Sequence, residues 1–398
     1  MNVTDLQPKM KSRIQTLLQL LPVLLAGTVL AAAPQPRTDI NPALLYWQAF
    51  STLPELKTDY GKYLGPDWAK GTLDAGAAEI ARRYDGISRI IRRAAKMNAP
   101  CDWGNDLSDG PATVLPNLAK IRRTAQSTAL RARVALEEGR EGDAKDDLIA
   151  VLYLGRHSAI NGALVQVMIG LAVEDMVVSF IAGNLHQFTP ATLRELGAAL
   201  DAAPKRITIA GAVKTERAAF YEWMLGKVES FRAAHPGDDG KALEEFRELM
   251  RRDIDGGSAD TANRIIDAAG GTSAGLLSYI KQIAPIYDAM DKVVTAPHDV
   301  ADQRFEDFTA MKSESTNLLA NLFIPNITRA RAKELESIAR LAMLRAAIAY
   351  KTGGDAAFQQ VRDPFGDGPF ERAGDEEGFE LRSKLAVQKT KGSMDFSK

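Results

Sequence analysis

The chain has 398 residues, of which 45% are hydrophobic and 25% charged, a composition typical of a globular protein and not of a disordered one. The formal net charge is −1, so the chain lacks the basic excess of most nucleic-acid binders, and no nucleic-acid partner is expected. Aromatic residues make up only 7%, while Ala, Leu, Arg and Glu are abundant, which favours helices over sheets.

Residues 1–33 have the order of a secretory signal peptide. Basic residues at positions 9, 11 and 13 precede an apolar run over 17–30, and three alanines follow it. Pro34 disfavours cleavage after Ala33, so cleavage after Ala31 fits the pattern better. The sequence therefore predicts an exported protein of the periplasm or cell envelope.

The alternative for this segment is an uncleaved anchor. Residues 14–33 are about long enough to cross a bilayer. Two glutamines and a proline within the segment weaken that interpretation. No second apolar run of this length follows, so any membrane contact is expected only through the N-terminal segment, if it is retained.

Residues 34–361 are predicted to form one α-helical domain of roughly a dozen helices. Apolar residues recur with helical spacing, as in Ile80, Tyr84, Ile87 and Ile91, and proline or glycine separates the runs. The expected helices cover residues 43–53, 72–97, 114–138, 143–157, 162–185, 190–204, 207–234, 241–253, 259–268, 274–294, 298–323 and 326–352. The helix over 162–185 is hydrophobic on nearly every side, which predicts a central position.

Helical hairpins are the expected packing unit. The pattern over residues 130–144, a helix followed by a glycine turn and a second helix, recurs over residues 344–356. Arrays such as tetratricopeptide repeats need at least three adjacent copies. Two distant copies therefore favour ordinary hairpin packing over a solenoid.

Residues 362–398 differ in character from the rest of the chain. Glycine and proline become frequent and the helical period fades, so we expect an extended tail. Residues 369–372 and 378–385 are candidates for the two strands of a small hairpin. The predicted fold class is therefore all-α, with a small extended or β-hairpin appendage.

Several short motifs in the loop and tail stand out. One group is Cys101-Asp102-Trp103-Gly104, followed by Leu115-Pro116 and the hairpin at 130–144. The other is Asp363-Pro364-Phe365, followed by Gly368-Pro369-Phe370 and Gly378-Phe379-Glu380-Leu381. These segments resemble uncharacterised exported α-helical proteins of environmental bacteria. The resemblance implies a helical fold and an exported location, and no activity.

The tail is also similar to the ending of the major pseudopilins of type II secretion systems. Glu371-Arg372 stands where that pattern has an aromatic residue, and Leu381-Arg382-Ser383 stands where it has Leu-Tyr-Ser. The acidic, glycine-rich ending that binds calcium in pseudopilins is absent. The similarity therefore implies no calcium site here, and no cofactor is expected.

The loop over residues 98–111 holds the only weak candidates for metal ligands. Asp102, Asp106 and Asp109 are oxygen donors that a hard cation accepts, but their spacing differs from that of an EF-hand loop. Aspartates in such loops more often cap turns. Trp103 is expected to pack the loop against the body. Cys101 is the only cysteine and is interpreted as a small buried side chain, with a reactive thiol as the alternative.

Glu174 and Asp175 are the best candidates for catalytic acids. They interrupt the most apolar helix, and a buried carboxylate needs a partner or a shifted pKa. Arg131, Arg156 and His157 are the expected partners. Paired carboxylates carry out glycoside hydrolysis, whereas a buried ion pair is the structural alternative.

Other catalytic patterns are missing from the sequence. The four histidines are far apart and show no zinc-binding spacing, and no nucleophile elbow, Walker loop or dinucleotide fingerprint occurs. Basic pairs at 82–83, 92–93 and 122–123 suggest contact with an anionic surface or acidic partner, or a solvated helix face. The leading prediction is a non-catalytic envelope protein that binds an envelope protein or has a structural role, and the alternative is an envelope glycan hydrolase.

Overall fold

The computed structural model describes residues 37–55, 63, 73–254, 258–375, 378–387, 390 and 392–396. Contacts divide the chain into Met1–Ile40 and the compact unit Asn41–Lys398, and the fold described below is that of the second unit. The predicted signal segment at 1–33 lies outside the described residues. The unit is helical with one small sheet, so the predicted all-α class with a β appendage is confirmed.

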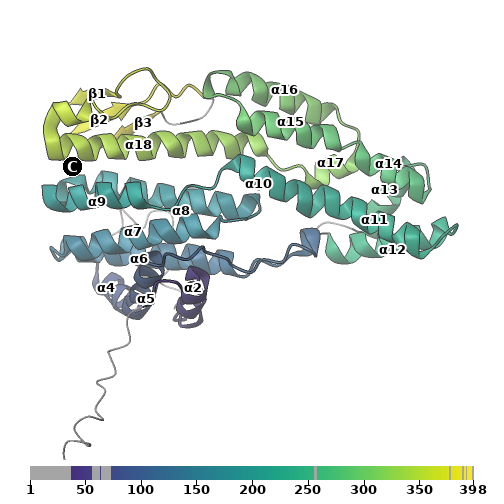
Figure 1. Cartoon of the computed structure of the whole chain (residues 1–398), viewed down its shortest axis with the longest axis horizontal. Coiled ribbons are helices and arrows are strands. Elements are labelled where there is room, and N and C mark those ends of the chain that lie inside the picture. The colour runs from purple at the N-terminus through teal and green to yellow at the C-terminus, as the bar shows by residue number, and fades with distance from the viewer. Residues whose placement is uncertain are drawn as a thin grey trace, which may run out of the picture. The chain divides into compact units, whose positions relative to one another are not determined.

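The elements follow one another in the order of their labels in Figure 1. The α-helices are α2 (Pro42–Ser51), α4 (Ala75–Arg83), α5 (Asp85–Ala95), α6 (Asn117–Glu137), α7 (Glu141–Ser158), α8 (Leu164–Gly183), α9 (Pro190–Ala202), α10 (Ile209–Glu216), α11 (Trp223–Ala234), α12 (Asp239–Asp253), α13 (Ala259–Ala268), α14 (Ser273–Lys281), α15 (Ala284–Thr295), α16 (Ala301–Glu314), α17 (Leu318–Phe323) and α18 (Ile327–Phe358). The strands are β1 (Glu371–Gly374), β2 (Phe379–Arg382) and β3 (Ser393–Asp395). A π-helical turn, η5 (Arg217–Glu222), joins α10 to α11.

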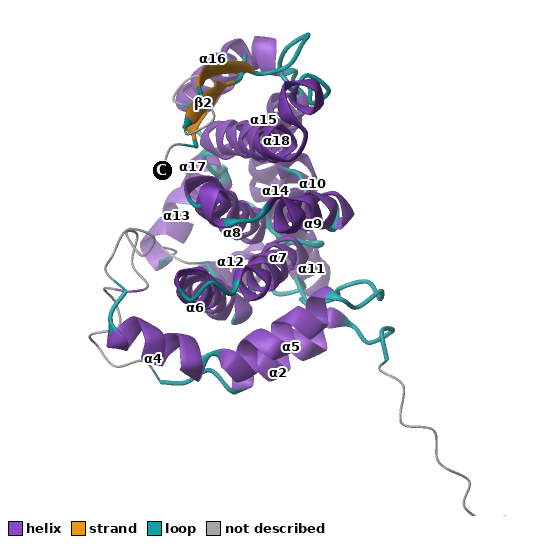
Figure 2. Ribbon diagram, turned by 90° about the vertical axis from the view of Figure 1, so that its left-hand side faces the viewer, coloured by secondary structure: helices purple, strands orange, loops and turns teal. Residues whose placement is uncertain are grey.

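The helices of the first half stack in layers within the compact unit. Helices α2, α4 and α5 lie along one side, against α6 and α7 (Figure 2). Helix α8 packs on α7, and α18 packs on α8 and α9. Gly155 of α7 and Gly170 of α8 permit the close crossing of these helices, because a Cβ at Gly170 would lie 2.7 Å from the Gly155 carbonyl oxygen.

Two hydrophobic cores share the helices α8 and α18. The first core contains α2, α4–α7, the end of α8, α9, most of α18 and the sheet. The second contains the start of α8, α10–α15, α17 and the start of α18. On α8 the change falls between Leu171 and Val173, and on α18 between Ala330 and Leu335. Both long helices therefore hold the two cores together.

Helix α8 occupies the central position that its composition predicts. It is the one described helix whose length and apolarity would suffice to cross a membrane, so the expectation that no second apolar run of that length follows the N-terminal segment is wrong. More than half of its most apolar stretch is buried, against α7, α18 and α10. Its hydrophobicity is explained by packing within the protein core.

Some of the expected helices are divided in the structure. Residues 72–97 contain α4 and α5, because Tyr84 has φ −93° and ψ 0° and ends the first helix. Residues 274–294 contain α14 and α15, and Pro285 lies in the first turn of the second, where its missing N–H costs nothing. Residues 298–323 contain α16 and α17, with Asn317 as the N-cap of the latter.

Only the first of the two similar segments forms a helical hairpin. Helices α6 and α7 turn at Gly139, whose φ of 72° favours glycine. In the second copy, Gly354 has φ 67° and ψ −161°, and it interrupts α18 one turn before its end at Phe358. A second long helix does not follow there, so the two copies do not form similar units.

The tail forms a three-stranded antiparallel sheet. The predicted hairpin corresponds to β1 and β2, and β3 was not predicted. The buried Asp363 organises the tail, because its carboxylate accepts hydrogen bonds from Ser383 Oγ (2.8 Å) and the Lys384 backbone N–H (2.6 Å). Phe379 and Leu381 are buried in the first core. The sheet thus packs with the helices inside Asn41–Lys398, whereas the predicted domain boundaries at 33/34 and 361/362 stay predictions.

Candidate functional site

Glu174 is buried between the two cores, with 1% of its surface exposed. Its Oε2 accepts a hydrogen bond from Arg156 Nε at 2.9 Å, and its Oε1 accepts one from Arg206 Nη2 and one from Ser337 Oγ. Arg206 lies in the segment between α9 and α10, and Ser337 lies on α18. Glu174 therefore joins α7, α8, α18 and the α9–α10 connection.

The ionised form of Glu174 is the stable one. Burial by itself raises the pKa of this carboxyl, but the Arg206 and Arg156 guanidiniums outweigh burial and hold the pKa below its usual value. A general acid needs the opposite shift, toward a protonated carboxyl near neutral pH. This environment favours a structural role for Glu174.

Two more buried carboxylates lie near the change from one core to the other, and each holds a helix start. Glu334 accepts the Ile209 backbone N–H at 2.9 Å, at the start of α10. Glu216 accepts the Leu164 backbone N–H at 2.7 Å, at the start of α8. Burial raises the pKa of Glu216 despite that hydrogen bond. These acids add to the caps that Thr208 and Gln166 already supply at the starts of α10 and α8.

Asp175 points away from Glu174. Neighbouring helix residues lie about 100° apart around the axis, so the two carboxylates face different surroundings. Asp175 has a 25% exposed side chain and pairs with Arg340 (2.6 Å) and Lys333 (3.5 Å) of α18. Of the expected partners only Arg156 contacts Glu174. Arg131 pairs with Asp85 and Asp147 instead, so that part of the prediction is wrong.

The loop aspartates cap turns and are not gathered into one site. Asp102 Oδ1 accepts the Gly104 backbone N–H, and Asp106 Oδ1 accepts that of Ser108, each at 2.9 Å. The hydrogen bond from the Ser108 backbone lowers the pKa of Asp106. Asp109 lies near the Arg252 guanidinium. Within the part of the chain that the structure describes, no three His, Cys, Asp or Glu side chains meet closely enough to hold a metal ion.

Trp103 anchors the loop in the first core, as the sequence predicts. Its ring stacks on Tyr46 at a centroid distance of 5.5 Å, and its Nε1 donates to the His157 carbonyl oxygen at 2.7 Å. Cys101 is buried nearby, and burial raises the pKa of its thiol to about 12. The thiol is therefore protonated and unreactive at neutral pH.

The far end of the same loop contacts the second core. Gly110 has φ 58° and lies against the ring of Trp223, where an added Cβ would be 2.4 Å from the ring. Trp223 Nε1 donates to the Ser108 carbonyl oxygen at 2.8 Å. The loop thus connects the two cores.

His157 makes folding stability depend on pH. Its Nδ1 lies 2.9 Å from the Tyr46 hydroxyl, and burial lowers the pKa of His157 to about 4. In the unfolded chain the pKa is about 6.5, so between these values only the unfolded state gains the proton. The contribution of neutral His157 to the free energy of unfolding is complete above pH ~6.5. It is lost at about 1.4 kcal/mol per pH unit as the pH falls toward 4.

Urea unfolding of wild type and His157→Gln between about pH 7 and pH 5 measures this contribution. We expect a shallower pH dependence of the unfolding free energy in the variant. Equal slopes for the two proteins would contradict a buried, neutral His157.

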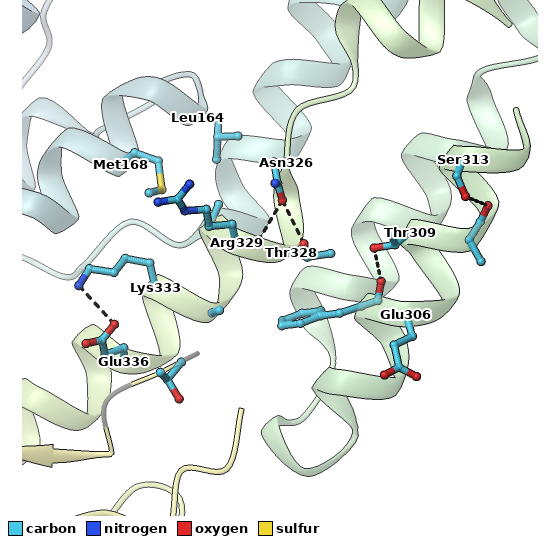
Figure 3. A pocket seen from close by; sticks show the side chains of 15 residues that line it. Leu164, Met168, Glu306, Thr309, Ser313, Asn326, Thr328, Arg329, Lys333 and Glu336 are labelled. Carbon is cyan, nitrogen blue, oxygen red and sulfur yellow. Dashed lines mark hydrogen bonds and ion pairs between the residues drawn. The ribbon is translucent and has the colours of Figure 1, made fainter. Parts of the chain in front are cut away.

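An open groove lies between α16 and α18, beside the first turns of α8 (Figure 3). Its volume is about 1330 Å³. The lining residues of α16 are spaced three, four and seven or eight apart, and so are those of α18. Each helix therefore turns one face toward the groove. The lining residues are Leu164, Met168, Phe305, Glu306, Thr309, Ala310, Ser313, Asn326, Thr328, Arg329, Ala330, Ala332, Lys333, Glu336 and Thr390.

The groove combines apolar and charged surfaces. Leu164, Met168 and Phe305 supply apolar contact, and Phe305 packs against both cores. Lys333 pairs with Glu336 at 3.3 Å as well as with Asp175. Arg329 is exposed, and no described carboxylate forms an ion pair with it. The arrangement can therefore bind an apolar group next to an acidic one.

Sequence reasoning missed this groove. The helical spacing of Arg329, Lys333 and Glu336 marks an exposed face of α18, but the sequence does not indicate that α16 lies opposite it. None of the lining residues is among the predicted site residues. The nearest of these is Asp175, which forms an ion pair with the lining residue Lys333.

Comparisons with protein-family models, with curated proteins and with solved structures find no match to this chain. The resemblance of the loop and tail to exported helical proteins and to pseudopilins therefore stays a prediction.

Proposed function

We propose that this chain is an exported, non-catalytic protein that binds another envelope protein in the groove between α16 and α18. The observation that carries the proposal is the exposed Arg329 guanidinium, which pairs with no carboxylate of the described residues, beside the apolar side chains of Met168 and Phe305. A compatible occupant is an amphipathic segment with an acidic side chain. Its apolar face would cover Met168 and Phe305, and its carboxylate would pair with Arg329.

The groove has the size and openness that a peptide segment requires. At about 1330 Å³ it exceeds the usual range for small-molecule sites, and α16 and α18 line its two sides. Lys333 is already neutralised by Asp175 and Glu336, which leaves Arg329 as the cation for a partner. We therefore expect Arg329 to determine the charge of the segment that binds.

Glycan hydrolysis is the less favoured function. Glu174 and Asp175 face different surroundings, and Glu174 is held by two arginines. A retaining or inverting hydrolase needs two carboxyl groups that flank one bond, one of them with a raised pKa. The different surroundings of the two carboxylates do not meet the first requirement, and the lowered pKa of the Glu174 carboxyl does not meet the second.

Photo-crosslinking tests the groove directly. A photoreactive amino acid at Thr309, which lines the groove, is expected to capture one discrete envelope protein. Arg329→Glu should reduce that product at least about tenfold, because it replaces an attractive charge pair by a repulsive one. The readout is the yield of the crosslinked band, with the partner identified by mass spectrometry and its affinity then measured with purified protein.

Matched controls separate groove binding from general adhesion. The probe at Gln303, on α16 but outside the groove lining, should capture little of the same protein. Arg264→Glu makes the same charge change on α13 and should leave the Thr309 product unchanged. Capture that is equal at both probe positions, or that survives Arg329→Glu, would reject the proposed binding site.

A further inference from the structure

The successive helices α4 and α5 carry a group of exposed basic side chains. On α5 the buried side contains Ile87, Ile91 and Ala94. The opposite, exposed side contains Arg89 and Arg93, four residues apart, and continues to Lys96 at the C-cap. Arg82, seven residues before Arg89, lies near the end of α4 and is also exposed. We call Arg82, Arg89, Arg93 and Lys96 the basic stripe.

The basic stripe is not neutralised by nearby acids. Glu79 pairs with Arg83 at 2.6 Å, and Asp85 pairs with Arg131 at 2.7 Å, so other arginines occupy these carboxylates. No ion pair joins a residue of the basic stripe to a described carboxylate. The stripe therefore keeps a local charge of about +4 although the whole chain is nearly neutral.

Helix α2 extends the same layer without adding charge. It packs beside α5, and its sequence contains no charged residue. Its exposed positions are Leu44, Gln48 and Ser51, which are spaced four and three apart, and Leu44 is 61% exposed. The layer thus combines four cations with an exposed leucine, and α2 supplies no carboxylate that would repel an anionic surface.

The shape of this layer suits an extended surface. Helices α2, α4 and α5 lie along one side of the compact unit, beyond α6 and α7 (Figure 2). On α5 alone, Arg89 to Lys96 spans about 10 Å at 1.5 Å per residue, and Arg82 on α4 lengthens the basic stripe beyond that. Four cations on the outer side of two successive helices do not converge on one small anion. They match many anionic groups arranged in a plane.

Along the sequence, α2 begins shortly after the predicted export segment. The three alanines that end the segment are followed, eight residues later, by Asn41, the N-cap of α2. Eight residues span at most about 28 Å. A chain held at the membrane by its N-terminal segment would therefore keep α2 near the lipid surface.

We propose that the layer of α2, α4 and α5 docks on bilayers that contain anionic phospholipid, with the basic stripe against the phosphate groups. Each basic side chain near such a surface strengthens binding by about fivefold at moderate ionic strength. This surface is separate from the groove between α16 and α18. The proposal therefore does not depend on the proposed protein partner.

Vesicle binding tests the proposal. Residues 37–398 are suitable, because every buried apolar residue of the described chain lies within Asn41–Lys398. The protein is expected to bind phosphatidylglycerol–phosphatidylcholine vesicles at low ionic strength and to dissociate from them at high salt. It should not bind vesicles of pure phosphatidylcholine. Combined Arg82→Gln, Arg89→Gln, Arg93→Gln and Lys96→Gln should weaken binding at least about tenfold.

A second variant with the same net charge provides the control. Lys214→Gln, Arg264→Gln, Lys281→Gln and Lys292→Gln remove four exposed cations from α10, α13, α14 and α15 and should change vesicle binding by less than about twofold. Three outcomes would overturn the proposal. Wild type fails to bind the anionic vesicles, the two variants lose binding equally, or duplex DNA binds as tightly as the vesicles.

Discussion

Replacing Glu174 by glutamine is expected to lower the free energy of unfolding by about 3–5 kcal/mol. The substitution keeps the size of the side chain but removes the charge that both Arg156 and Arg206 share. Two guanidiniums then remain in a buried place without a counter-ion, and their desolvation is no longer compensated. Urea unfolding followed by far-ultraviolet circular dichroism measures the change.

Asp175→Asn is the matched control for this substitution. Asp175 is the next residue of α8, but its partly exposed side chain pairs with α18 in contact with solvent. Its loss should cost less than about 1 kcal/mol. If Glu174→Gln unfolded at the same urea concentration as wild type and abolished a glycan-cleaving activity, Glu174 would be catalytic and the structural assignment would be wrong.

Trp103→Ala is expected to destabilise the unit by about 3–5 kcal/mol. The indole is 7% exposed and stacks on both Tyr46 and Phe50 of α2, at centroid distances of 5.5 and 6.1 Å. Its removal leaves a cavity in the first core and removes the shorter of two hydrogen bonds to the His157 carbonyl oxygen, which keeps the one from the Ile160 backbone N–H at 3.4 Å. The midpoint of urea unfolding measures this loss.

Trp103→Phe separates packing from the hydrogen bond. Phenylalanine retains an aromatic ring but cannot donate to the His157 carbonyl oxygen, so we expect a loss of about 1–2 kcal/mol. If Trp103→Ala cost no more than Trp103→Phe, the ring would contribute little, and the loop would not be held by the first core.

The sequence alone was sufficient for the fold class and for most elements. Helical spacing of apolar residues is a local property, and α6, α7 and α8 correspond to the predicted ranges 114–138, 143–157 and 162–185. Proline and glycine positions located most of the breaks, because their backbone effects are also local. The break between α4 and α5 falls at Tyr84, which is neither proline nor glycine, so the sequence did not indicate it.

The burial of Glu174 and Trp103 could also be inferred from sequence. A carboxylate in the most apolar helix must be compensated, and a tryptophan in a polar loop needs an apolar surface to cover it. The partners could not be inferred. Arg206 contacts Glu174 from the α9–α10 connection. Trp103 stacks on α2 and donates a hydrogen bond to α7, and both helices are distant from it in the sequence.

The sequence by itself determined the helical content, the buried acid and the basic residues of α4 and α5. Only the tertiary structure decided which side chains meet. It separated Glu174 from Asp175 and brought α16 opposite α18 to form the groove. It also left Arg329 and the basic stripe without an ion pair to any carboxylate in the described part of the chain. The physical reason is that helix periodicity specifies which face a residue occupies, whereas the partner of that face depends on packing between distant segments.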